Sequence, residues 1–150
     1  MGSLTLGETK GCCSIAYEGL RNERYRFPDQ SIWRVTEHWA TTNSGFKAVI
    51  VVPEGRSDVY VMSFAGTDSL LDVAVDLAQV AGQTPRQYSQ ALIWARMAYS
   101  VAGSNFVLSG HSLGGGMAAY CSVAMGCPAF TVNPAPLIGA ASLRSLGSNA

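Results

Sequence analysis

One short segment of the chain combines residue types that can do chemistry, Gly110-His111-Ser112-Leu113-Gly114. It has the G-x-S-x-G pattern of a nucleophile elbow. The residues before it, 105–109, are mostly apolar and predict a short buried strand, and residues 115–124 after it predict a helix. A strand, a sharp turn and a helix form the context in which this pattern presents a serine hydroxyl for attack.

The spacing of the motif indicates a role for each position. Gly110 and Gly114 supply the small neighbours that a sharp turn requires, and Ser112 is the candidate nucleophile. The backbone N–H of Leu113 is expected at a helix N-terminus, where it can stabilise an oxyanion. A tight glycine-rich turn without catalytic function is the alternative interpretation of the same residues.

The rest of a catalytic triad is missing from its expected place. No Asp, Glu or His follows Ser112, although enzymes with this elbow place the acid and then the histidine downstream of the serine. His38 is the one histidine outside the elbow, and we expect it to be a surface or half-buried residue between Trp33 and Trp39. The base and its acid are therefore expected beyond Ala150 or from another chain.

Composition excludes several classes of partner. The 150 residues carry no net charge, are 48% hydrophobic and only 13% charged, and contain no basic tract. We therefore expect no nucleic-acid partner. No apolar run is long enough to span a membrane, and no signal peptide is expected at the N-terminus, which predicts a protein that is cytoplasmic or exported by a signal-independent route.

All ten acidic residues lie at or before Asp76. Because a free surface normally mixes both signs of charge, a partner chain or a missing C-terminal segment is expected to cover the second half.

Neither a metal nor a cofactor is expected. The four cysteines, Cys12, Cys13, Cys121 and Cys127, lack metal-ligand spacing, so reduced buried thiols are favoured and a disulfide is the alternative. Residues 114–119 match a loose dinucleotide-binding pattern, but no acid follows at the required distance. The phosphate-binding Walker A pattern fails because no lysine follows the glycines.

Hydrophobic periodicity predicts an α/β domain. A helix is expected over residues 14–21 and a loop over 25–31. A hairpin of two strands, 46–52 and 58–64, is followed by helices over 70–80 and 86–101, the strand and helix around the elbow, and a last strand over 129–132. The tail from residue 137 is expected to hold a short helix. Helical crossovers predict a mostly parallel sheet with helices on both faces, apparently truncated after the last strand.

Two further motifs accompany the elbow. Phe64-Ala65-Gly66-Thr67-Asp68 follows the second hairpin strand, and Asp72 and Asp76 lie on the next predicted helix. With the elbow, these motifs resemble the class 3 (fungal-type) lipase family of α/β-hydrolases over about residues 45–137. The chain departs from the family at Ala65, where an arginine is usual, so an ion pair expected near the elbow is lost.

The resemblance implies a serine carboxylic-ester hydrolase of the lipase or phospholipase type, acting on an ester or lipid substrate. It implies that Ser112 is the nucleophile, that Thr67 and Leu113 form the oxyanion hole, and that His111 supports the turn. Asp72 and Asp76 would be structural. We expect one domain over residues 1–150, with an N-terminal helix and loop region over 1–44 and a lipase-like core over 45–137. A catalytically inactive fragment or pseudoenzyme that acts as a protein-interaction module is the alternative.

Overall fold

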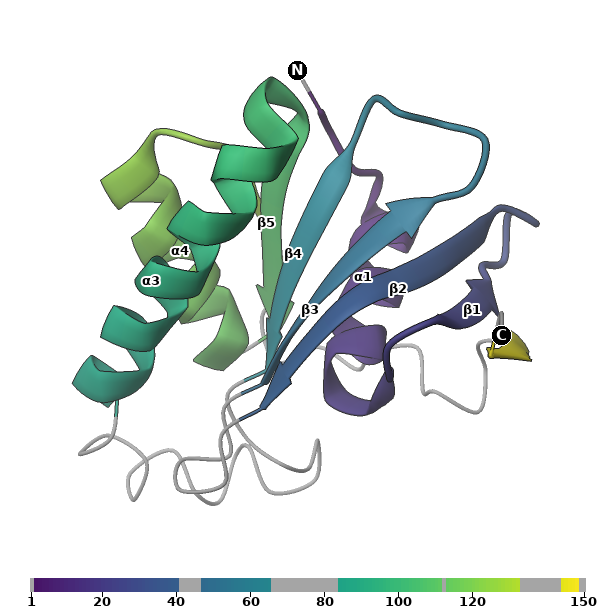
Figure 1. Ribbon diagram of the computed structural model, residues 1–150, viewed down its shortest axis with the longest axis horizontal. Coiled ribbons are helices and arrows are strands. Elements are labelled where there is room, and N and C mark those ends of the chain that lie inside the picture. The colour runs from purple at the N-terminus through teal and green to yellow at the C-terminus, as the bar shows by residue number, and fades with distance from the viewer. Residues whose placement is uncertain (1, 41–46, 66–83, 112, 133–143, 149–150) are drawn as a thin grey trace.

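The protein is an α/β structure built in three layers. The computed structural model describes residues 2–40, 47–65, 84–111, 113–132 and 144–148. One mixed sheet lies in the middle, with helix α1 (Leu6–Glu18) on one face and helices α3 (Thr84–Ala102) and α4 (Leu113–Met125) on the other (Figure 1). Helices on both faces were predicted, and this arrangement confirms them.

The strand order corrects the prediction of a mostly parallel sheet. Over the described residues the order is β6-β5-β4-β3-β2-β1-β7. The neighbours β4, β5 and β6 run parallel, whereas β3, β2, β1 and β7 add to one another and to β4 in antiparallel fashion. The parallel pairs result from helical crossovers, as expected. The antiparallel half consists of strands β1, β2 and β3 from the N-terminal part of the chain and of the C-terminal strand at residues 144–148, which adds to β1.

The elements around the motifs follow the predicted pattern. Strands β3 (Lys47–Pro53) and β4 (Tyr60–Ala65) form the expected antiparallel hairpin. Helix α3 is followed by the short 3-10 helix η2 (Gly103–Asn105), where Gly103 has a φ of 66° that favours glycine. Strand β5 (Phe106–His111), helix α4 and strand β6 (Ala129–Val132) complete the order that the sequence predicted.

The N-terminal region differs from its prediction. Helix α1 begins eight residues earlier than expected, because Thr5 and Glu8 form a capping box at its start. The predicted loop over 25–31 begins inside strand β1 (Glu23–Arg26), and strand β2 (Ile32–Ala40) was not predicted. Residues 1–44 are therefore more than a helix and loop region, because two strands of the sheet come from them.

The C-terminal tail also differs. Strand β7 (Arg144–Ser148) was not predicted, and it pairs with β1. Residues 137–143, where the short helix was expected to begin, lie outside the described residues. The helix predicted over residues 70–80 lies outside the described residues.

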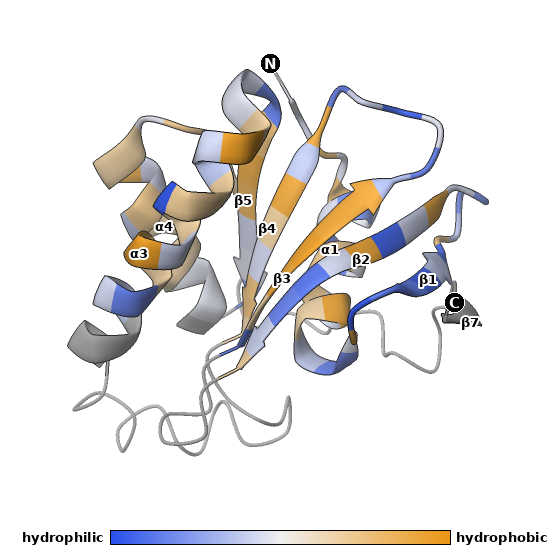
Figure 2. Ribbon diagram, in the orientation of Figure 1, coloured by the Kyte–Doolittle hydropathy of each residue, from blue (hydrophilic) through white to orange (hydrophobic). Residues whose placement is uncertain are grey.

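Two apolar clusters, one on each face of the sheet, form the core. Val49, Val61 and Val107 face α1, while Ile50, Met62 and Leu108 face α3 and α4. Figure 2 shows that the apolar residues are concentrated in β3, β4 and β5, whereas β1 is mostly hydrophilic. The strand that carries the elbow is thus buried on both faces and firmly positioned.

Candidate active site

The elbow lies where buried strand β5 gives way to helix α4. Strand β5 ends at His111 and helix α4 begins at Leu113, so a single residue connects the two elements. That residue, Ser112, lies outside the described residues, as do Thr67 and the two aspartates Asp72 and Asp76. The geometry of the elbow is therefore defined by the residues that flank the serine in the sequence.

Gly110 and Gly114 occupy positions where no larger residue fits. A Cβ atom on Gly110 would overlap the backbone of Gly114, and it would lie 2.7 Å from the nitrogen of Gly115. A Cβ atom on Gly114 would overlap the carbonyl oxygen of Phe64 and lie 3.3 Å from the Cα of Ala65. The start of α4 is therefore packed directly against the ends of both β5 and β4, and this close approach requires glycine.

Leu113 provides the first residue of α4. The first N–H groups of a helix have no partner within the helix and lie at the positive end of its dipole. The Leu113 N–H, next in sequence to the serine, therefore lies at the positive end of α4.

His111 is buried beneath the turn and faces α1. It is 5% exposed, and its Nδ1 lies 3.2 Å from the hydroxyl of Tyr17, in hydrogen-bond contact. The two rings also meet edge to face, with centroids 6.2 Å apart. Tyr17 is held in turn by Lys47, whose Nζ donates a hydrogen bond to its backbone oxygen at 3.0 Å. The histidine of the elbow is thus bound into the core.

A buried polar cluster lies on the α1 side of the sheet, two residues before His111. Ser109 donates a hydrogen bond from its Oγ to the Oγ of Ser63 at 2.8 Å, and the two residues pair across β4 and β5. Burial raises the pKa of the Cys13 thiol to about 12, against the opposing effect of its hydrogen bonds with the two serines and Gly110. These residues tie α1 to the base of the elbow. Sequence reasoning missed them, because only the tertiary contact gives them a shared role.

His38 lies too many strands away across the sheet to reach the elbow. It pairs with Val49, which pairs with Ser63, which pairs with Ser109. With neighbouring strands about 4.8 Å apart, β2 and β5 are separated by about 14 Å, whereas direct proton transfer needs a contact of about 3 Å. His38 is half-buried, as the sequence predicted.

The four cysteines are buried free thiols. Among the residues with described positions, no group of three or more His, Cys, Asp or Glu side chains gathers as a metal site would require. Within the same residues, no helix combines the length and the apolar character needed to cross a membrane.

Comparison with known proteins places the chain in a family. A family model for a phospholipase-like group, the Tle-like phospholipase domain, matches residues 23–145. An extracellular phospholipase A1 of Serratia liquefaciens is 40% identical over 92 residues, which cover 61% of this chain. The matched segment spans 28% of the length of that relative. No solved structure matches the chain. From the extent of the family match, the chain belongs to the phospholipase-like family defined by the Tle-like phospholipase domain.

Proposed function

We propose that the chain carries the nucleophile part of a serine phospholipase with an α/β-hydrolase-like fold. The observation that supports this most directly is the tight junction of β5 and α4. Gly110 and Gly114 lie so close to neighbouring backbone atoms there that a Cβ atom on either would overlap them. Ser112 lies between these two glycines in the sequence. The family match and the phospholipase A1 relative supply the substrate class, a phospholipid carboxylic ester.

The proposed reaction has two halves. The Ser112 hydroxyl gives its proton to a general base while its oxygen bonds to the ester carbonyl carbon. The tetrahedral oxyanion accepts hydrogen bonds from the Leu113 N–H and from Thr67, as the resemblance to class 3 lipases implies. Collapse breaks the ester bond, and the lysophospholipid leaves with a proton from the base. Water then hydrolyses the acyl-serine, which releases the fatty acid and restores the hydroxyl.

We assign the general base to neither histidine of this sequence. His111 is 5% exposed and hydrogen-bonded to Tyr17, and β2, which carries His38, lies about 14 Å from β5. In our proposal the base and its orienting acid lie outside residues 1–150, and these residues form one domain whose lipase-like core spans 45–137. His111 then acts as a support for the turn.

A second candidate function is a non-catalytic interaction module. It is favoured by the exposed apolar side chains of α3, since Ile93, Met97 and Val101 recur every four residues and are 61%, 51% and 78% exposed. In this alternative, a partner chain or a further segment covers that helix face, and the elbow is a structural turn.

Covalent labelling separates the two candidates. We would incubate the protein with a fluorophosphonate, measure its intact mass, and assay fatty-acid release from phosphatidylcholine with the same samples. Ser104→Ala serves as a control, because Ser104 is an exposed serine. The proposal is supported if the native protein and Ser104→Ala are labelled and Ser112→Ala is not. Fatty-acid release that survives Ser112→Ala would refute the serine mechanism. Because the proposal places the base outside residues 1–150, absence of labelling refutes it in a chain extended past Ala150, and that result would favour the interaction module.

A further inference from the structure

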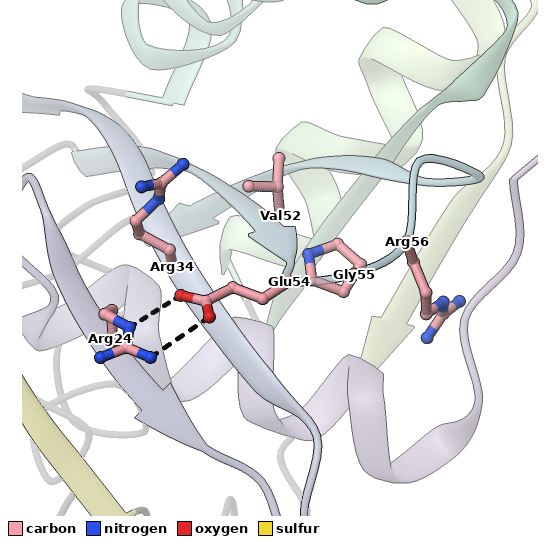
Figure 3. Close-up of a pocket in the computed structure, with 7 residues that line it drawn as sticks. Arg24, Arg34, Val52, Glu54, Gly55 and Arg56 are labelled. Carbon is pink, nitrogen blue, oxygen red and sulfur yellow. Dashed lines mark hydrogen bonds and ion pairs between the residues drawn. The ribbon is translucent and has the colours of Figure 1, made fainter. Parts of the chain in front are cut away.

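A pocket unrelated to the elbow opens at the other end of the sheet. It has a volume of about 510 Å³ and is lined by residues of β1, β2, the end of β3 and the turn after it (Figure 3). Because β3 runs antiparallel to β4, the end of β3 lies opposite the end of β4 that contacts Gly114. The pocket therefore has no part in the proposed ester hydrolysis. Three of the seven residues that line it are arginines.

The sheet register forces two of these arginines together. Arg24 on β1 and Arg34 on β2 are direct Cα partners in the antiparallel pair, and Arg34 also pairs with Val52 on β3. Side chains of directly paired residues lie on the same face of a sheet, and like charges in that relation repel. Such a pair needs negative charge nearby.

Glu54 supplies part of that negative charge, and its carboxylate binds Arg24 directly. Its carboxylate accepts hydrogen bonds from Nε and Nη2 of Arg24 at 2.7 and 3.2 Å. The hydrogen bond from Arg24 lowers the pKa of Glu54, which keeps the carboxylate ionised. The backbone N–H of Glu54 is also bonded to the oxygen of Ile32 at 2.8 Å, so the turn holds this residue in place.

Arg56 is neutralised by other residues. Its guanidinium bonds both oxygens of Asp58, at 3.0 and 3.1 Å, and bonds Glu8 at 2.9 Å. In Figure 3 its side chain points away from the other two arginines. Arg56 thus shapes the pocket and contributes little free charge.

Among the described residues, Arg34 has no salt-bridge partner of its own, although the Glu54 carboxylate attracts it at longer range. Within the part of the chain that the structure describes, it forms no ion pair, and its Nε is buried with no hydrogen-bond partner. Its side chain is turned away from the Glu54 carboxylate in Figure 3. A buried donor without a partner is costly, and the cost is greater for a charged group. The pocket therefore holds one guanidinium whose Nε has no hydrogen-bond partner among the described residues and whose charge is offset only at longer range by Glu54.

From this arrangement we propose that the pocket is a binding site for a phosphate group, with Arg34 as its principal contact and Arg24 as a second source of positive charge. A guanidinium matches the spacing of phosphate oxygens and binds them with two parallel hydrogen bonds. The pocket volume lies in the range typical of small-molecule sites, so it has room for more than the phosphate alone. The phosphate is a free phosphate ion or the phosphate of a lipid headgroup. The site stands independently of the proposed hydrolase function.

Titration at constant ionic strength tests the site. Binding of inorganic phosphate and of glycerophosphocholine would be measured by calorimetry in chloride buffer. We expect Arg34→Gln to weaken binding about tenfold, because it removes a charge-assisted contact. We expect Glu54→Gln to strengthen binding, because it removes the carboxylate that competes for Arg24. Arg96→Gln removes the same charge from an exposed position on α3 and should leave binding unchanged.

The outcomes are separable. Tighter binding of glycerophosphocholine than of phosphate identifies a lipid headgroup, and the reverse order identifies the free ion. The proposal is overturned if the native protein shows no saturable binding, or if Arg34→Gln binds as well as Arg96→Gln. Circular dichroism would check that Arg34→Gln is folded. If it is not folded, Glu54→Gln decides, since unchanged or weaker binding by that variant overturns the proposal.

Discussion

Replacement of Gly114 by alanine tests the close packing at the elbow. The new Cβ atom would overlap the Phe64 carbonyl oxygen and lie 2.8 Å from the carbonyl carbon. These atoms belong to the backbone of central strand β4, so they cannot rotate away as a flexible side chain would. Relief requires helix α4 to move off the sheet.

The expected loss of stability combines two opposing effects. Overpacking in a well-packed core costs about 1–3 kcal/mol, and a backbone clash belongs at the upper end of that range. Alanine in a helix gains about 1 kcal/mol over glycine. The net destabilisation is therefore about 2 kcal/mol, which lowers the melting temperature by about 4–8 °C in a protein of this size.

Thermal and urea unfolding would measure the effect, with Gly7→Ala as the matched control. Gly7 also lies in a helix, but a Cβ there meets nothing within 4 Å. The control should gain about 0.5–1 kcal/mol from the helix propensity alone. If Gly114→Ala melts as high as Gly7→Ala, the packing of α4 on the end of β4 is wrong.

Two further predictions concern stability. Because burial raises the pKa of Cys13 from 9.0 to about 12, the unfolded chain loses this proton first, so stability is retained below about pH 9 and falls as the pH rises to about 12. Urea unfolding at about pH 8 and about pH 10 should show a smaller alkaline loss for Cys13→Ala than for the native protein, and an equal loss would contradict the assignment. Thr5→Ala removes the side chain that accepts a hydrogen bond from the Glu8 N–H at 3.1 Å, and it should cost about 1 kcal/mol in urea unfolding. Ser3→Ala removes an exposed hydroxyl just before the helix, and a loss as large as that of Thr5→Ala would show that the cap does not stabilise α1.

Sequence pattern predicted the elements that have either a continuous apolar run or a regular apolar period. Strands β3, β4, β5 and β6 and helices α3 and α4 appear close to their expected bounds. Strand β2 escaped prediction because its alternation is interrupted. The pairing register of β2 with β3 shifts between Val35 and Glu37. Trp33 and Val35 are buried, but the alternation of buried and less buried residues stops at Thr36. Strand β1 has only four residues, three of them charged, and it forms through pairing with its neighbours.

The sequence by itself determined the local geometry of the elbow. Two glycines at a spacing of four, between an apolar run and a helix-forming run, specify a sharp turn through steric limits that act among adjacent residues. Only the tertiary structure decided what surrounds that turn. The Tyr17 contact with His111, the Cys13 cluster and the Arg24–Arg34 pair all join distant segments. Such contacts depend on strand order and register, which follow from the packing of the whole sheet and leave no mark on the residues nearby in the sequence.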